Sequence, residues 1–291
     1  MKKTVVITGA STGLGFAAAL LFAKDGYEVY ATMRNLKKKQ ALVDAAKKEG
    51  IDLSIEQLDV TQMDSVQNCI NKIVAKTGKI DCFINNAGAG YIRSTEQATM
   101  EDIQWVTDVN YLGVVRCTKA VLPLMREAKK GHIINITSVG GLVGQPFNEF
   151  YCAAKFAVEG YTESMASYIT ESFGIKFSLI EPGGISTEFV NNVMTQVGSS
   201  GGMLQDEYLP ILQQYIGGAQ KRAASCQSQI YQTSKQVAEV VLAVANNDNP
   251  PIRTRTSEWS NQFCQLKTEA DPDGTKSVSY THLTLPTILL V

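Results

Sequence analysis

Short apolar runs rich in β-branched residues alternate with longer helical patterns over most of this chain. Such runs lack polar alternation, which is typical of strands covered on both faces. Helical segments between them can serve as crossovers that join parallel strands. The alternation therefore predicts an α/β fold built on a doubly wound parallel sheet. The expected strands are TVVITG, EVYATM, LSIEQLDV, IDCFINNAG, GHIINITSV and IKFSLIEPG, with the longest helices at Met63–Thr77, Glu101–Lys129 and Tyr151–Phe173.

The regular alternation ends after Thr187. A single domain is predicted over residues 1–255, in which residues 188–235 form a substrate loop or lid containing the flexible break VGSSGG. A helix over SKQVAEVVLAVANN and an edge strand over PIRTRTS follow, and residues 256–276 form a C-terminal extension. Residues 277–291 (SVSYTHLTLPTILLV) resemble translated sequencing-adapter read-through and are interpreted as a non-native tail; the alternative is an apolar tail that docks on a neighbour.

Composition excludes several classes of function. With 27 basic and 28 acidic residues, the chain gives no indication of a nucleic-acid partner or of attraction to anionic membranes. Its apolar runs are too short for a secretory signal or a transmembrane helix, so a cytoplasmic location is expected. The six cysteines form no C-x-x-C pair and are expected to be reduced thiols. The only histidines, His132 and His282, are too few for a histidine-based triad or metal site.

Two stretches read Tyr-x-x-x-Lys: YCAAK at Tyr151–Lys155 and YQTSK at Tyr231–Lys235. In a chain of this composition chance alone gives about one such pair, so context must separate them. Tyr151 begins a helix soon after a strand end that carries Ser138, and four-residue spacing puts Tyr151 and Lys155 on one helix face. Tyr231 follows no obvious strand. We therefore predict that Tyr151–Lys155 belongs to an active site and that Tyr231–Lys235 is a chance match.

The turn after the first strand, TGASTGLG, contains Gly9, Gly13 and Gly15. Glycines let backbone N–H groups approach a pyrophosphate, and the following helix N-terminus adds partial positive charge. Taken alone, the turn is equally compatible with a tight strand–helix connection. Its place at the end of the first strand favours a dinucleotide site, because ligands of doubly wound sheets bind at the carboxyl ends of the strands.

The G-x-x-x-G-x-G spacing, preceded by Thr8, resembles the nucleotide-binding signature of the short-chain dehydrogenase/reductase family. NNAG after the fourth strand, Asn110 in the next helix, Ser138 followed by YCAAK, and PGGIST after the sixth strand match the same family. The resemblance covers roughly residues 3–190 and implies a Rossmann-like fold. EPGGISTEF and ATMRN resemble the branch of steroid- and retinol-type dehydrogenases. The resemblance also implies a homo-dimer or homo-tetramer formed through Glu101–Lys129 and Tyr151–Phe173.

Carbonyl reduction needs a hydride and a proton, and oxidation is the reverse. A free tyrosine has a pKa of about 10, and a nearby ammonium such as that of Lys155 would lower it. Ser138 could hold the substrate oxygen by a hydrogen bond that strengthens as charge develops. By resemblance, Lys155 also binds the ribose hydroxyls and Asn110 holds a water in a proton relay. The alternatives are that Ser138 caps a turn, Asn110 satisfies helix backbone and Tyr151 is part of an amphipathic wall.

An acidic residue at the end of the second strand would select NAD, but Thr32 occupies that place and Arg34 follows. Arginine can pair bidentately with a 2′-phosphate, with Ser11 or Thr12 assisting, which favours NADP(H) and leaves NAD(H) possible. Alternatively, Arg34 only solvates a helix start. By resemblance, Asp59 faces the adenine. The expected cofactor-binding residues are Gly9, Ser11, Thr12, Gly13, Leu14, Gly15, Arg34, Asp59, Val60, Asn86, Ala87, Gly88, Tyr151, Lys155, Pro182, Gly183, Ile185 and Thr187.

These features predict an NADP(H)-dependent oxidoreductase that interconverts a carbonyl and a secondary alcohol. Apolar residues between 188 and 235 favour a small, hydrophobic substrate, although such residues more often line a core. One rival is a catalytically silent sensor of the cofactor, which would typically lack part of the Tyr/Lys/Ser set. Another is an epimerase or dehydratase of the same fold, and those proteins usually carry a different glycine spacing and a longer substrate domain.

Overall fold

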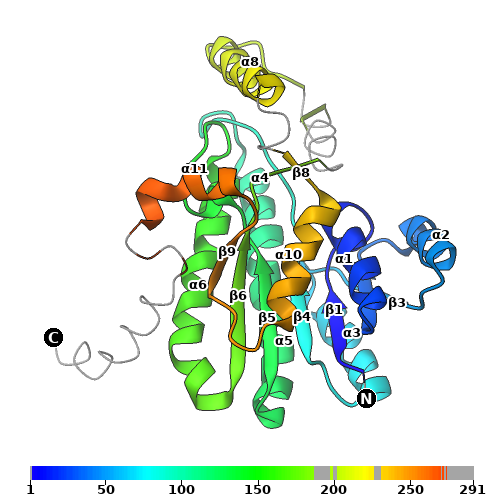
Figure 1. Ribbon diagram of the computed structural model, residues 1–291. Coiled ribbons are helices and arrows are strands. Elements are labelled where there is room, and N and C mark those ends of the chain that lie inside the picture. The colour runs from blue at the N-terminus through cyan, green and yellow to red at the C-terminus, as the bar shows by residue number, and fades with distance from the viewer. Residues whose placement is uncertain are drawn as a thin grey trace.

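The computed structural model describes residues 2–186, 197–198, 202–225, 231–269, 271 and 273. Its centre is a seven-stranded parallel sheet with strand order β3-β2-β1-β4-β5-β6-β9 (Figure 1). The strand order reverses between β1 and β4, where ligands bind in this type of sheet. The predicted Rossmann-like, doubly wound sheet is confirmed. The strands are β1 (Thr4–Ile7), β2 (Glu28–Met33), β3 (Ser54–Gln57), β4 (Cys82–Asn85), β5 (Gly131–Ile136), β6 (Ile175–Glu181) and β9 (Arg253–Arg255).

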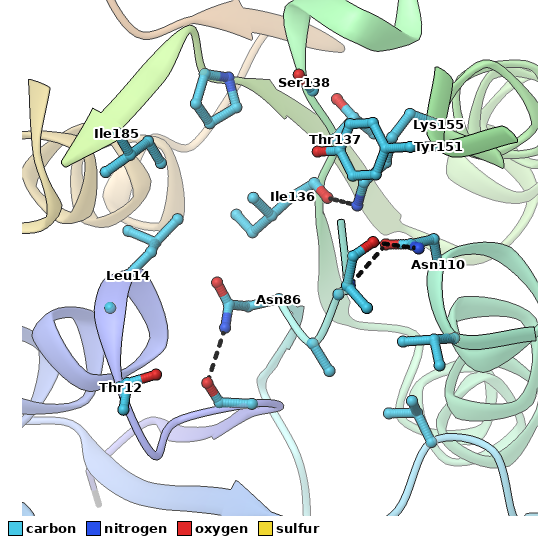
Figure 2. A pocket seen from close by; sticks show the side chains of 18 of the residues that line it. Thr12, Leu14, Asn86, Asn110, Ile136, Thr137, Ser138, Tyr151, Lys155 and Ile185 are labelled. Atoms are coloured by element: carbon cyan, nitrogen blue, oxygen red, sulfur yellow. Dashed lines mark hydrogen bonds between the residues drawn. The ribbon is translucent and has the colours of Figure 1, made fainter. Parts of the chain in front are cut away.

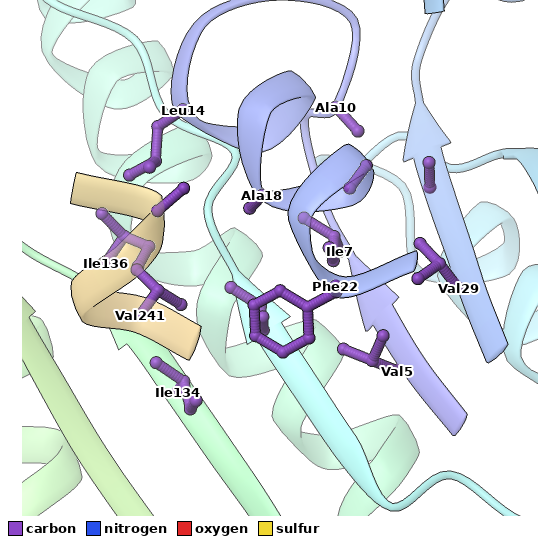
Figure 3. Close-up of a cluster of buried hydrophobic side chains, with 14 of the residues drawn as sticks. Val5, Ile7, Ala10, Leu14, Ala18, Phe22, Val29, Ile134, Ile136 and Val241 are labelled. Atoms are coloured by element: carbon purple, nitrogen blue, oxygen red, sulfur yellow. The ribbon is translucent and has the colours of Figure 1, made fainter. Parts of the chain in front are cut away.

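Helices cover both faces of the sheet, so every residue of the central strands β1, β4 and β5 is buried. Val5 and Ile7 of β1 pack toward Phe22 of α1 and Val241 of α10 (Figure 3), whereas Val6 belongs to the hydrophobic cluster of the opposite face. The helices are α1 (Gly13–Lys24), α2 (Gln40–Glu49), α3 (Met63–Thr77), α4 (Met100–Thr107), α5 (Gly113–Ala128), α6 (Glu149–Phe173), α8 (Leu209–Ser225), α10 (Ser234–Asn246) and α11 (Glu258–Thr268).

The helix expected over Glu101–Lys129 is interrupted. α4 runs into η2 (Asp108–Leu112), a π-helical turn, which leads directly into α5. Such turns carry one extra residue within a continuous helix and often occur at functional sites. Asn110, a predicted catalytic residue, lies within this turn.

The chain between β6 and α10 also differs from the expected pattern. β7 (Gly184–Ser186) pairs in parallel with β8 (Tyr231–Thr233) as a separate two-stranded sheet. Residues 202–208 dock on the loop after β4, where Arg93 donates to the Gly202 carbonyl at 2.7 Å and Gln97 donates to Asp206 at 2.8 Å. Figure 1 shows α8 beyond the end of the sheet at which the strands finish. Parts of the predicted lid, Thr187 and the whole of the predicted tail 277–291 lie outside the described residues.

In the described part of the chain, no helix is long and apolar enough to cross a membrane. Cys69, Cys82, Cys117, Cys152 and Cys264 are buried free thiols. His132 is buried on β5, where its Nε2 lies 2.9 Å from the Ser178 hydroxyl, and burial lowers its pKa to about 3. His132 is therefore neutral at physiological pH and serves the core.

Candidate active site

A cleft of about 670 Å³ lies at the carboxyl ends of the strands. Figure 2 shows Ser138, Tyr151 and Lys155 grouped on one side of it, with Thr12 and Leu14 on the other. The described lining includes most of the predicted site. These residues are Gly9, Ser11, Thr12, Gly13, Leu14, Arg34, Asp59, Val60, Asn86, Ala87, Gly88, Asn110, Ser138, Tyr151, Lys155, Pro182, Gly183 and Ile185.

The glycine-rich turn is held against the end of β4. Gly9 has a φ of +68°, and a Cβ at this position would come within 2.8 Å of the Ala87 Cα. The Asn86 amide donates to the Thr8 and Gly9 carbonyls at 2.8 and 3.2 Å, and the Thr8 hydroxyl accepts from the Asn86 and Ala87 N–H groups. Asn86 therefore positions the two loops as well as lining the cleft.

The N-terminus of α1 opens into this turn. Thr12 occupies the N-cap without a side-chain cap, and the first turn contains no acidic residue. First-turn N–H groups of a helix have no intrahelical partner, so they and the helix dipole suit a pyrophosphate.

Gly15 does not line the cleft. A Cβ at Gly15 would lie 2.5 Å from both the Asn86 Nδ2 and the Gly9 carbonyl oxygen. The structure therefore shows Gly15 as a packing residue between α1 and the strand ends, and its predicted contact with the cofactor stays a prediction.

The end of β2 forms the far end of the cleft. Thr32 is buried there and donates to the Ile7 carbonyl at 3.1 Å, whereas Arg34 is exposed. Lys38, which the sequence analysis missed, also lines this end. Two cations, Arg34 and Lys38, therefore lie beside a strand end that carries no carboxylate.

Asp59 lines the same end of the cleft, and its carboxylate is also used locally. Oδ1 accepts from the Thr61 N–H at 3.0 Å and from the Thr61 hydroxyl at 2.8 Å. The Asp59 N–H is 3.0 Å from the Ser65 hydroxyl of α3. Asp59 therefore forms the turn before α3, and its predicted contact with adenine stays a prediction.

Ser138 and Tyr151 meet at the other end of the cleft. Ser138 follows β5 and precedes η3 (Val139–Gly141), and its Oγ accepts from the Gly140 N–H at 3.0 Å. Tyr151 lies in the first turn of α6 and is hydrogen bonded to Ser138. Ser138 thus does cap a turn, as the alternative interpretation held, while it also contacts the tyrosine.

Lys155 is one helical turn after Tyr151 and is only 4% exposed. Its ammonium donates to the Ile136 carbonyl at 2.9 Å and lies 5.7 Å from the centroid of the Tyr151 ring. Burial lowers the pKa of Lys155 to about 8, and the charge of Glu159 opposes that effect. At neutral pH the charged form of Lys155 therefore predominates.

Burial raises the pKa of Tyr151 to about 12, although its hydrogen bond with Ser138 acts in the opposite direction. The sequence analysis expected a lowered pKa. The difference arises because the tyrosine loses its hydration, while the Lys155 ammonium lies over the ring. Tyr151 consequently keeps its proton at neutral pH, as a proton donor for carbonyl reduction must.

Asn110 is fixed by three hydrogen bonds. Its Nδ2 donates to the Ala89 carbonyl at 2.8 Å and to the Val106 carbonyl at 2.9 Å, and its Oδ1 accepts from the Ala89 N–H at 3.1 Å. The π-helical turn thereby binds the loop after β4. The bond to Val106 agrees with the alternative that Asn110 satisfies a backbone group of its own helix. The role of Asn110 in holding a water of the proton relay stays a prediction.

The sequence analysis missed several lining residues near Tyr151. Gln145 and Asn148 lie just before α6 and share a hydrogen bond of 3.0 Å. Trp259 of α11 stacks on Phe263 with ring centroids 5.0 Å apart, and a Cβ on Gly183 would come within 2.8 Å of its ring. Gln145 and Asn148 could have been found by searching the segment between Ser138 and Tyr151, whereas no local signal marks Trp259.

Tyr231 also lines the cleft, from β8. Lys235 does not accompany it, because its side chain is 77% exposed and lies 4.0 Å from Glu239. YQTSK therefore forms no Tyr/Lys couple, although its tyrosine borders the site.

The chain matches the short chain dehydrogenase family over residues 3–198. It is 37% identical to retinol dehydrogenase 8 of Bos taurus over 97% of this chain and 90% of the relative, and 35% identical to 17-beta-hydroxysteroid dehydrogenase type 1 of Homo sapiens over 97% and 86%. The solved structure of ElxO with NADP bound is 31% identical, with a TM-score of 0.69 over 88% of this chain and 96% of that chain.

The chain therefore belongs to the short-chain dehydrogenase/reductase family, as its motifs predicted. It is an oxidoreductase that acts on CH–OH groups.

Proposed function

We propose that this protein is an NADP(H)-dependent oxidoreductase that interconverts a carbonyl and a secondary alcohol, with Tyr151 as the general acid and base. The observation that carries the proposal is the arrangement of one cleft. Tyr151, Ser138 and Lys155 converge at one end, and Arg34 and Lys38 flank the other. Between them lies the glycine-rich turn at the N-terminus of α1.

When bound, the nicotinamide supplies the hydride for reduction. Tyr151 donates its proton to the substrate oxygen, and Ser138 donates a hydrogen bond that strengthens as negative charge develops there. The Lys155 ammonium stabilises the phenolate that remains on Tyr151. In oxidation the same tyrosine accepts the proton. An ammonium has three N–H donors, and Ile136 takes one among the described residues, so others suit the ribose hydroxyls.

The preference for NADP(H) rests on Arg34 and Lys38. A guanidinium and an ammonium at the end of β2 would attract a 2′-phosphate, whereas NAD carries only a hydroxyl at that atom. The similarity to a protein whose structure holds NADP supports the same assignment. NAD(H) remains the weaker substrate in this proposal.

An apolar carbonyl compound is the proposed substrate class. Trp259 and Tyr231 give the substrate end of the cleft an aromatic wall, and large flat side chains favour apolar partners. The names of the two relatives, a retinol dehydrogenase and a hydroxysteroid dehydrogenase, support the same class. We also propose a homo-dimer or homo-tetramer that pairs α4–α5 and α6, where Leu112 and Phe156 are exposed.

The test follows NADPH consumption with a panel of retinoid aldehydes, steroid ketones and quinones. We expect Tyr151→Phe to lower kcat/KM by about 10²–10⁴-fold, because the variant has no proton to donate. Tyr168→Phe, an exposed change on the same helix, should match the wild type. Turnover that survives Tyr151→Phe would overturn the mechanism, and NADPH binding without turnover of any compound would favour the sensor alternative.

A further inference from the structure

The buried face of α6 continues beyond the active site as a row of charged residues. Lys155 is followed at four-residue spacing by Glu159 and then Glu163, so all three lie along one side of the helix. Lys155 is 4% exposed and Glu159 is 5% exposed. Charges this deeply buried are rare unless they are paired, because each must give up its hydration.

The edge strand β9 supplies the opposite charges. The Arg253 Nε lies 3.5 Å from a Glu159 oxygen and 3.7 Å from a Glu181 oxygen, and its guanidinium also pairs with Glu163. Arg255 lies 3.0 Å from the other Glu181 oxygen. The order Lys155, Glu159, Arg253, Glu181, Arg255 therefore alternates in sign from the active site to the edge of the sheet. With Glu163 included, cations and carboxylates are equal in number.

Glu159 also packs against the loop that carries Ser138. A Cβ on Gly141 would lie 3.2 Å from both the Glu159 Cγ and the Lys155 carbonyl oxygen. The hydroxyl of Thr137, a lining residue of the cleft, lies against the Glu159 carboxyl. The Glu159 side chain therefore packs tightly against Gly141 and Thr137, which lie on either side of Ser138 in the sequence.

We propose that Glu159 is a positioning residue that keeps the Lys155 ammonium charged beneath Tyr151, and that Arg253, which lies between the Glu159 and Glu181 carboxyl groups, keeps the Glu159 carboxylate charged in turn. This inference rests on the proposed function, because it concerns the lysine that serves Tyr151. Glu159 touches neither substrate nor cofactor in this assignment. Its effect passes through Lys155.

The electrostatics of the group agree with its geometry. Burial lowers the pKa of Lys155 to about 8, and Glu159 is the charged group that opposes this. Burial raises the pKa of Glu159, and the charge of Arg253 opposes that rise. Burial and repulsion from Glu159 together raise the pKa of Glu181, and the charge of Arg255 opposes that rise. Lys155 faces Tyr151 and Glu159.

Glu159 itself faces charged and titratable groups from four elements. They are Lys155 and Glu163 on α6, Glu181 on β6, Arg253 on β9 and the Cys264 thiol on α11. Burial raises the pKa of that thiol to about 11, so it adds no charge near neutral pH. The lysine is charged below its pKa, so a carboxylate that raises this pKa extends activity toward higher pH.

The test compares Glu159→Gln, Glu159→Asp and Glu163→Gln. Glu163→Gln is the matched control, because it removes a carboxylate that pairs with Arg253 but lies two helical turns from Lys155. The pH dependence of kcat/KM is measured for NADPH-driven reduction. The pH dependence of the NADPH dissociation constant is measured by cofactor fluorescence, and this measurement needs no carbonyl substrate. Thermal unfolding sets a working temperature at which every variant is folded.

We expect the high-pH decline of kcat/KM to begin about one pH unit lower in Glu159→Gln, which is about a fivefold loss at pH 8 and approaches tenfold at higher pH. NADPH binding should weaken over the same pH range. In Glu159→Asp the decline of kcat/KM should begin at a pH between those of the wild type and Glu159→Gln. In Glu163→Gln it should begin at the same pH as in the wild type.

Identical pH profiles for the wild type and Glu159→Gln, with only the melting temperature changed, would overturn the proposal and leave Glu159 a structural role. If Glu159→Gln does not fold, Glu159→Asp decides in the same way. If the wild type turns over no carbonyl compound, the proposed function fails, while the NADPH-binding profiles still test the link from Glu159 to Lys155.

Discussion

At the residue scale, Arg34 and Lys38 line the cleft beside the end of β2, where the proposed function puts the 2′-phosphate of NADPH. A hydrogen bond to a charged group is worth about 1.5–3 kcal/mol, so we expect Arg34→Ala to raise the KM for NADPH by about 10–100-fold. The KM for NADH should change little, since NADH has no 2′-phosphate. Lys37→Ala is the matched control, because the neighbouring Lys37 is exposed but does not line the cleft. Equal losses with both cofactors would refute this role of Arg34.

Prediction from sequence worked at this scale where a residue directly follows a strand. Asn86 and Ser138 each lie just after a strand, and the parallel sheet brings such strand ends to one edge, where both residues line the cleft. It failed for the pKa of Tyr151, because spacing places Lys155 on the correct helix face but says nothing about burial. Nor could it show that Gly15 packs closely against Asn86 and the Gly9 backbone, because that approach is visible only in three dimensions.

At the scale of elements, α1 can pack on the strand ends only because residue 15 has no side chain. We expect Gly15→Ala to lower the free energy of unfolding by about 1–3 kcal/mol, as overpacked sites do, since its Cβ would lie 2.5 Å from Gly9 and Asn86 atoms. Gly160→Ala is the matched control on α6, where nothing lies within 4 Å, and it should be neutral or stabilising by about 0.5–1 kcal/mol. Denaturant unfolding of both variants measures the difference. A Gly15→Ala protein as stable as the Gly160→Ala protein would contradict this account of α1.

The helix α4–η2–α5 shows what periodicity cannot predict. Its apolar pattern continues across residues 101–129, so it reads as one helix, and its outer bounds were predicted within about two residues. The extra residue of the π-helical turn leaves no mark in that pattern. The turn carries a tertiary contact that periodicity cannot report, since Asn110 binds both backbone groups of Ala89.

At the scale of the whole molecule, the cleft is completed by a helix distant in sequence from the dinucleotide-binding strands. The sequence analysis set residues 256–276 apart as an extension, because periodicity gives no information about where a terminal helix docks. In the structure, α11 brings Trp259 against Gly183, and the Trp259 ring stacks on Phe263. The substrate end of the site is therefore shared between the sheet and the C-terminal segment.

This arrangement predicts that Trp259 contributes to substrate specificity more than to cofactor binding. We expect Trp259→Ala to lower kcat/KM for large apolar carbonyl compounds by about 10–100-fold, because removing the indole withdraws apolar surface worth about 1.5–3 kcal/mol. Trp259→Phe should retain most of the activity, and Phe263→Ala should have a smaller effect in the same direction, since Phe263 acts by supporting the indole. The measurement is kcat/KM across a series of ketones of increasing size, with the NADPH dissociation constant recorded for each variant. A loss that is equal for small and large ketones, or that appears only in NADPH affinity, would show that Trp259 supports the nicotinamide side of the cleft at Gly183 and does not select the substrate.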